Sequence, residues 1–260
     1  MKELRLILLL SAVFITIAYV STIPGRNRAK LQEETIVSET TESTVETTTP
    51  APYETDENGA IIIGETTTDK SNVTPDNEWA LYLINSENPL PEGFTVNAKY
   101  VQGTYEMDSR AANYMIAMID AAKNDGIEIK VLSALRTIEY QQKLLDREIE
   151  TYKNEGYSDD EAYKLATAGV AIPGESEHNA GLAADLCNLA ENFENSDEFA
   201  WLDKHAHEYG FILRYPKGKQ DITGIYYEPW HYRFVGVYHA KEIKDSGLCL
   251  EEYIGQLEGE

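Results

Sequence analysis

The sequence predicts an α+β fold in which a central antiparallel sheet of about four or five strands has helices on one side and at its ends. Apolar residues recur at helical spacing between residues 112 and 122, which indicates a helix that faces a core. The run 127–132 then alternates apolar and polar side chains, as a half-buried strand does. A length of 260 residues accommodates one such domain with appendages.

The first 30 residues are predicted to form a membrane anchor or a signal segment. Residues 6–23 are almost entirely apolar and carry no charge. As a helix rising 1.5 Å per residue, such a stretch spans roughly 27 Å, close to the thickness of the hydrocarbon core of a bilayer. The small-residue pattern that precedes a cleavage site is poor here, so the length favours an anchor over a cleaved signal.

Residues 31–78 have a different composition and are predicted to be a disordered, acidic, Thr-rich tether. They contain 12 threonines and 12 acidic residues against a single lysine, Lys70. A segment with so little apolar surface cannot offset the entropy that ordering would cost. It would hold the domain predicted for residues 79–260 away from a membrane.

The net charge of −23 and the two cysteines limit the functional classes. Strong acidity argues against a nucleic-acid partner and against an anionic membrane surface as a ligand. Cys187 and Cys249 would form a disulfide in an oxidising compartment if their backbones lay within reach, and two separate buried thiols are the default expectation.

Within the domain, local signals place the helices and strands. Asp108 or Ser109 is a plausible N-cap for the first helix, which Gly126 closes. After the strand 127–132, a helix is predicted over roughly 138–155. The remaining predictions are a helix over 159–168 that begins with a capping box at Ser158 and Glu161, strands over 182–186, 211–216 and 225–234, and helices over 196–209, 238–246 and 249–257.

Two short segments punctuated by Gly and Pro contain candidate metal ligands. The first contains His178 and Asp185, and the second contains His231 three residues after Glu228. Two imidazole nitrogens and one carboxylate oxygen are a ligand set of the kind a catalytic zinc uses, with the fourth position open for water. Glu228 would then lie beside that water, where a general base is needed.

In a regular strand, residues three apart face opposite sides of the sheet, so Glu228 and His231 can share a site only if the backbone between them is distorted. Pro229 cannot join a strand ladder and is a good reason for such a bulge. The other histidines are at positions 205, 207 and 239. They are predicted to lie on the surface of helices.

These motifs carry a family resemblance. Ser-x-His-x-x-Gly-x-Ala-x-Asp followed by Glu-x-Trp-His resembles the signature of the VanY-like D-alanyl-D-alanine carboxypeptidases, which belong to a zinc peptidase group that includes the D-Ala-D-Ala dipeptidases and the hedgehog fold. The resemblance covers about residues 80–257. It implies a hedgehog-like domain with one zinc ion on the exposed face of the sheet, held by His178, Asp185 and His231, with Glu228 as catalytic base.

The resemblance also implies roles for residues around the metal. Arg136 corresponds to an arginine that meets the substrate carbonyl or carboxylate, and it is therefore both a catalytic and a substrate-binding candidate. Gln141 and Ser176 correspond to residues of the substrate pocket. Trp230 is expected to form a wall of that pocket, although a core aromatic would explain it equally well.

The function implied is zinc-dependent D,D-carboxypeptidase activity that removes the terminal D-alanine from peptidoglycan stem peptides, with water activated by zinc and Glu228. An L,D-carboxypeptidase or a peptidoglycan endopeptidase of the same group remains an alternative, as does a non-catalytic cell-wall binding module. The expected partners are the stem peptide and, through the amino-terminal segment, the membrane. We expect a monomer at the extracellular face of the cell membrane or in the cell wall, placed there by a single-pass anchor or after secretion.

Overall fold

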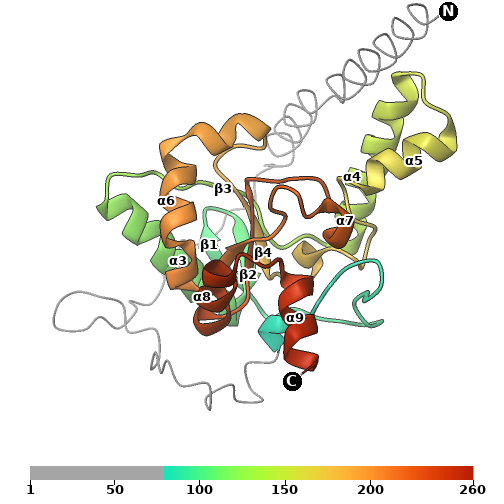
Figure 1. Ribbon diagram of the computed structural model, residues 1–260. Coiled ribbons are helices and arrows are strands. Elements are labelled where there is room, and N and C mark those ends of the chain that lie inside the picture. The colour runs from blue at the N-terminus through green and yellow to red at the C-terminus, as the bar shows by residue number, and fades with distance from the viewer. Residues whose placement is uncertain (1–78, 260) are drawn as a thin grey trace, which may run out of the picture.

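The computed structural model describes residues 79–259, so the predictions for residues 1–30 and 31–78 lie outside the described part of the chain. The described residues form an α+β fold, as predicted (Figure 1). A four-stranded antiparallel sheet has the order β3-β4-β6-β5, and a separate hairpin pairs β1 with β2. The strands are β1 (Ala98–Gln102), β2 (Tyr105–Asp108), β3 (Val131–Ser133), β4 (Ala183–Leu186), β5 (Phe211–Leu213) and β6 (His231–Phe234).

The predicted helices occur in the predicted order, and side-chain caps fix the starts of several of them. The side chains of Asp108, Ser158 and Ser196 each accept a hydrogen bond from a backbone N–H in the first turn of a helix, and Ser158 forms the predicted capping box with Glu161. The helices are α3 (Ser109–Asn124), α4 (Ile138–Asn154), α5 (Asp159–Thr167), α6 (Asp197–His205), α7 (Gln220–Thr223), α8 (Val237–Ser246) and α9 (Leu250–Glu258), with 3-10 turns η3 (Glu177–Ala180), η4 (Glu191–Asn195) and η5 (Ala206–Tyr209).

The two faces of the sheet have different chemistry because side chains alternate along each strand. On β6, Tyr232 and Phe234 point into the main apolar core, where they meet residues of α3 and α6. His231 and Arg233, which alternate with them along the strand, therefore lie on the opposite face. This second face is the one that carries the polar residues described below.

Three strand predictions were too long. The predicted strand 127–132 shrinks to β3 because the Gln102 side chain bonds both Ile129 O, at 3.0 Å, and Val131 N, at 2.7 Å. The predicted strand 211–216 ends at Leu213. The predicted strand 225–234 begins only at His231, because residues 228–231 form a turn.

Two further features were not anticipated. The β1–β2 hairpin was not predicted. The backbone N–H of its last residue, Asp108, donates to the carbonyl oxygen of Gly181, between His178 and Asp185 in sequence, at 2.9 Å. Gly181 has a φ of +67°, and a Cβ there would lie 2.7 Å from Asp108 N, so this close approach requires glycine. His239, predicted to be exposed, is 4% exposed, with its Nδ1 2.8 Å from the Tyr253 hydroxyl.

Helices α4 and α5 form a helical hairpin that projects from the sheet (Figure 1) and packs around its own apolar cluster, which includes Leu144, Leu145 and Ala162. Among residues 79–259, no helix combines the length and the apolar character that crossing a bilayer requires. Cys187 and Cys249 are both free thiols, as the default expectation had it, but only Cys249 is fully buried and Cys187 is half-buried.

Candidate metal centre

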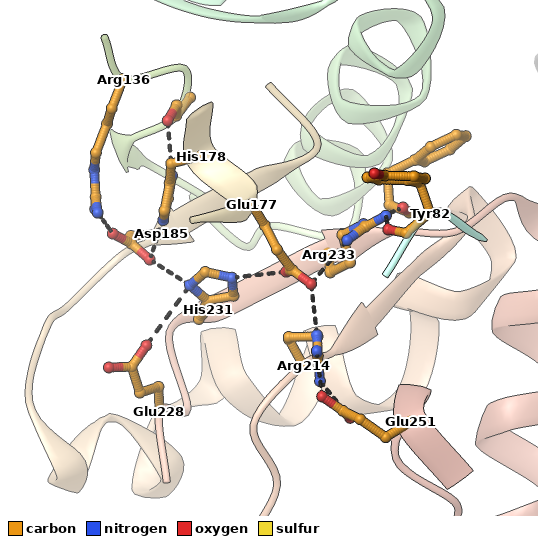
Figure 2. Close-up of polar contacts among 12 residues, drawn as sticks. Tyr82, Arg136, Glu177, His178, Asp185, Arg214, Glu228, His231, Arg233 and Glu251 are labelled. Carbon is orange, nitrogen blue, oxygen red and sulfur yellow. Dashed lines mark hydrogen bonds and ion pairs between the residues drawn. The ribbon is translucent and has the colours of Figure 1, made fainter. Parts of the chain in front are cut away.

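The three predicted metal ligands come together from two strands and one 3-10 turn. Asp185 of β4 pairs directly with His231 of β6 in the antiparallel register, so their side chains are cross-strand neighbours on one face of the sheet. His178 reaches the same point from η3 (Figure 2). One potential ligand atom from each residue lies within 4.8 Å of the other two, and all three residues are buried.

The donor atoms converge on the Asp185 carboxylate. Asp185 Oδ1 lies 3.3 Å from His178 Nε2 and 3.2 Å from His231 Nδ1. His178 Nε2 and Asp185 Oδ1 are nevertheless buried without a hydrogen-bond partner among the described residues. Buried polar atoms are rarely left unsatisfied, and here two of them face each other with lone pairs. A divalent cation between them would satisfy both atoms, so these residues fit a zinc ion.

The outer nitrogens of both imidazoles are bonded so that the inner nitrogens face the site. His178 Nδ1 lies 2.7 Å from the carbonyl of Ala134, which can only accept, so Nδ1 carries the proton and Nε2 keeps a lone pair. His231 Nε2 lies 3.3 Å from Glu177 Oε2, and Nδ1 faces Asp185. Such outer partners are typical of histidines that bind metals.

The surroundings of the site shift the pKa values of the two histidines in opposite directions. Burial, assisted by the Arg136 guanidinium, lowers the pKa of His178 to about 4. Burial also acts to lower the pKa of His231, but the carboxylates of Asp185 and Glu177 outweigh it and raise that pKa to about 9. The pKa of Asp185 is low because His178 and Arg136 outweigh the effect of its burial. The carboxylates therefore favour positive charge on the His231 side of the site, whereas burial and Arg136 disfavour it at His178.

Glu228 approaches from the turn that precedes β6. His231 N donates to Glu228 O at 3.1 Å, which closes the turn, and Glu228 N donates to Tyr215 O at 3.2 Å. The turn brings Glu228 Oε2 to 3.6 Å from His231 Nδ1. The expected distortion at Pro229 is thus a tight turn before the strand instead of a bulge within it. The turn places the side chains of Glu228 and His231 at one site, as the bulge was expected to do.

Arg136 and Gln141 lie together beside Asp185. The Arg136 guanidinium forms an ion pair with Asp185 Oδ2, donates from Nε to Ser133 Oγ at 2.7 Å and donates from Nη1 to Gln141 Oε1 at 3.4 Å. Gln141 Nε2 donates to Ala171 O at 2.8 Å. A guanidinium has five N–H donors, so these three bonds leave N–H groups for another ligand.

A cleft of about 390 Å³ opens over the metal ligands and contains every predicted site residue. Ser176 and Trp230 line it although each is only about 5% exposed, and Trp230 also belongs to the main core, so both explanations of that tryptophan hold. The cleft is lined by Arg136, Gln141, Gly169, Val170, Ala171, Ser176, His178, Asp185, Tyr215, Ile225, Glu228, Trp230 and His231.

Sequence reasoning missed two buried polar residues inside the first motif that contact the predicted site residues. Glu177 contacts His231 from the side away from the cleft. Asn179 joins the segment before η3 to the loop that carries Arg136, because its Oδ1 accepts from Gly174 N at 3.0 Å and its Nδ2 donates to Arg136 O at 2.9 Å. Both residues flank His178 in sequence, so their polarity within a buried motif was the available signal.

Comparison with known proteins agrees with this geometry. The family model described as VanY, D-alanyl-D-alanine carboxypeptidase, matches residues 104–237. A D-alanyl-D-alanine carboxypeptidase of Enterococcus faecalis is 41% identical over 177 residues, which are 68% of this chain and 66% of that protein. This chain therefore spans just under two thirds of the length of that relative.

Solved structures are similar over the same region. A vancomycin-resistance D,D-pentapeptidase VanY variant in complex with Zn(II) matches with a TM-score of 0.63 and 40% identity, covering 68% of this chain and 99% of that one. VanYB in complex with D-alanine-D-alanine matches with the same TM-score and identity, over 68% and 98% of the two chains. The LdcB LD-carboxypeptidase matches with a TM-score of 0.56 and 35% identity, over 66% and 84%.

Proposed function

Because this chain belongs to the VanY family of D-alanyl-D-alanine carboxypeptidases, we propose that it is a zinc-dependent D,D-carboxypeptidase that removes the terminal D-alanine from peptidoglycan stem peptides. One observation carries the proposal. His178 Nε2, Asp185 Oδ1 and His231 Nδ1 converge at the floor of a cleft that also contains Glu228 and Arg136. This is the donor set, acid–base group and cation that hydrolysis of a peptide bond at a terminal carboxylate needs.

His178, Asp185 and His231 would hold the zinc ion. When bound, zinc supplies a water of lowered pKa, near about 7, and a Lewis acid for the scissile carbonyl. Glu228 performs the proton transfers. Its carboxylate accepts a proton from the water as the water oxygen bonds to the scissile carbonyl carbon. It then donates that proton to the nitrogen of the leaving D-alanine as the C–N bond breaks.

Arg136 binds and orients the substrate in this proposal. Arg136 lines the cleft, where its remaining N–H donors would bond the scissile carbonyl oxygen or the terminal carboxylate. Its ion pair with Asp185 fixes the guanidinium relative to the metal ligands. Gln141, Ser176 and Trp230 line the same cleft and would contact the peptide around its last two residues.

The test uses the purified protein with synthetic stem pentapeptide and tetrapeptide, with and without zinc chelation. Release of D-alanine from the pentapeptide, lost on chelation and restored by zinc, is the expected result. Failure to release it from the pentapeptide by a protein that binds zinc would overturn the proposal. Release of internal fragments would instead indicate an endopeptidase, and no release from either peptide would favour a non-catalytic wall-binding module.

L,D-carboxypeptidase activity is the second candidate, because the LdcB LD-carboxypeptidase is similar over two thirds of this chain. An enzyme of that specificity removes D-alanine from the tetrapeptide, where the preceding residue has the L configuration. Comparing initial rates on the two peptides distinguishes the candidates. Equal release from both would mean that the cleft does not discriminate the configuration of the penultimate residue.

The proposed location is the extracellular face of the membrane or the cell wall, with the monomeric domain tethered through residues 31–78. The support is the uncharged apolar stretch 6–23 followed by the acidic, Thr-rich segment. Fractionation of cells expressing the full chain tests this location. We expect the protein in the membrane fraction, cleaved by protease added outside intact cells, and protection from that protease would contradict the proposal.

A further inference from the structure

We propose that Glu177 is a positioning residue that fixes which nitrogen of His231 faces the metal, and that segments near both ends of the described chain hold Glu177 in place through two buried arginines. This inference rests on the proposed function for its catalytic consequence. The contacts that carry it are independent of any turnover (Figure 2).

Glu177 is surrounded on one side by cations and on the other by His231. Its side chain is 0% exposed. Oε1 accepts from Arg214 Nε at 2.6 Å and from Arg233 Nη1 at 2.8 Å. Oε2 lies 3.3 Å from His231 Nε2. Two guanidinium groups on one oxygen keep the carboxylate ionised, so its second oxygen can only accept a hydrogen bond.

An acceptor at this place dictates the state of the His231 ring. Nε2 must donate to Glu177, so when a metal ion replaces the second ring proton, only Nδ1 can offer it a lone pair, on the side that faces Asp185. The ring is also packed against Tyr215, with ring centroids 4.8 Å apart. Glu177 thus acts on the metal through His231, without reaching the cleft itself.

The two arginines are held by parts of the chain outside the family-matched region 104–237. Arg214 donates from both terminal nitrogens to the carboxylate of Glu251 on α9, at 2.8 and 2.6 Å. Arg233 Nη2 donates to the carbonyls of Ala80 and Tyr82, at 3.0 and 2.9 Å. Each guanidinium therefore has a fixed partner on the side away from Glu177, which stops it from rotating off the carboxylate.

Glu177→Gln tests the positioning role directly. The amide can accept from the arginines with its oxygen, but its NH₂ group then faces His231 Nε2 and favours the ring form that carries the proton on Nδ1. The zinc dissociation constant, measured by competition with a chromophoric chelator, should rise about 10- to 100-fold. In ¹⁵N spectra of the zinc-loaded wild type, His231 should be bound through Nδ1 with a protected Nε2–H.

Glu251→Gln tests the outer contact and covers the case in which Glu177→Gln does not fold. It weakens the hold on Arg214 from the far end, so zinc affinity should fall by a smaller factor, about 3- to 10-fold. Glu252→Gln is the matched control on the same helix, because Glu252 pairs with Lys219 and not with Arg214. It should leave zinc affinity unchanged.

The results separate this inference from the proposed activity. Unchanged zinc affinity in both variants, or His231 bound through Nε2 in the wild type, would overturn the positioning role even if the protein hydrolyses stem peptides. A wild type that hydrolyses no stem peptide, yet shows the predicted losses of zinc affinity, would overturn the activity and leave the positioning role standing.

Discussion

Two buried charged clusters meet at His231. The cleft-side cluster contains His178, Asp185 and Glu228, and the far-side cluster contains Glu177, Arg214 and Arg233. They differ in how fully their polar atoms are satisfied by hydrogen bonds. On the cleft side, His178 Nε2 and Asp185 Oδ1 have no hydrogen-bond partner among the described residues. On the far side, both terminal nitrogens of Arg214, and both of Arg233, donate to oxygens within 3.0 Å. The clusters are equally buried, so burial does not explain the difference.

The difference distinguishes the cleft-side cluster, which can bind a ligand, from the far-side cluster, which holds His231 in place. A polar cluster with every atom satisfied has nothing left to offer a ligand and contributes rigidity, whereas unsatisfied acceptors that point at one place retain the capacity to bind a cation. Changes on the cleft side should therefore alter chemistry with little effect on folding. Changes on the far side should alter folding, and affect chemistry only through His231.

Glu228→Gln gives the largest expected effect. The amide cannot accept and return a proton, so kcat/KM on the stem pentapeptide should fall about 10²- to 10⁴-fold. Zinc affinity and the unfolding midpoint should stay close to the wild type, because Glu228 is not one of the three candidate ligands. Near-normal rates in this variant would show that another group carries the proton.

Arg233→Met should have its main effect on stability. Removing one cation from a fully buried cluster leaves the charge of Glu177 partly uncompensated, and the free energy of unfolding should fall by about 3–5 kcal/mol in urea denaturation. Lys241→Met is the control, because its ion pair with Asp245 is exposed and screened by solvent, so the free energy of unfolding should stay close to that of the wild type. Equal losses in the two variants would contradict the idea of a rigid support.

Arg136→Lys tests whether Arg136 acts by contacting the substrate or by holding Asp185. A lysine keeps the charge beside Asp185 but loses the guanidinium fork, so kcat/KM should fall about 10²-fold, near the low end expected for loss of an oxyanion donor. The zinc dissociation constant should change much less. If the variant lost zinc as readily as activity, Arg136 would act by holding Asp185 and not by contacting the substrate.

His239 is a buried histidine outside both clusters, and it shows how burial alone makes the stability of this protein depend on pH. Burial lowers its pKa to about 4, so the unfolded chain takes up a proton at higher pH than the folded protein does. The stability contributed by neutral His239 is present above about pH 6.5 and is lost as the pH falls toward about 4, by roughly 1–2 kcal/mol. Urea denaturation across this range should show a smaller decline for His239→Gln, and parallel curves would refute the assignment.

Local signals in the sequence accounted for the helices and the ligand set. A cap such as Asp108 or Ser158 acts on backbone groups within three residues, so it can be identified without knowing the fold. The candidate metal ligands were predicted for a similar reason, because His178 and Asp185 share one short motif. Pro229 marked a break beside His231, although the sequence did not show that the break is a turn closed by the bond from His231 N to Glu228 O.

Tertiary structure decided what depends on residues far apart in the chain. Gln102 shortened β3 from 29 residues away, and the Tyr253 hydroxyl meets the buried His239 across 14 residues. The support of His231 joins Glu177 to Arg214 across 37 positions. Composition and periodicity predicted an acidic α+β domain, and two short motifs predicted the candidate zinc ligands. Which nitrogen of His231 faces the metal was decided by folding alone, because only folding places an ionised acceptor against the other nitrogen.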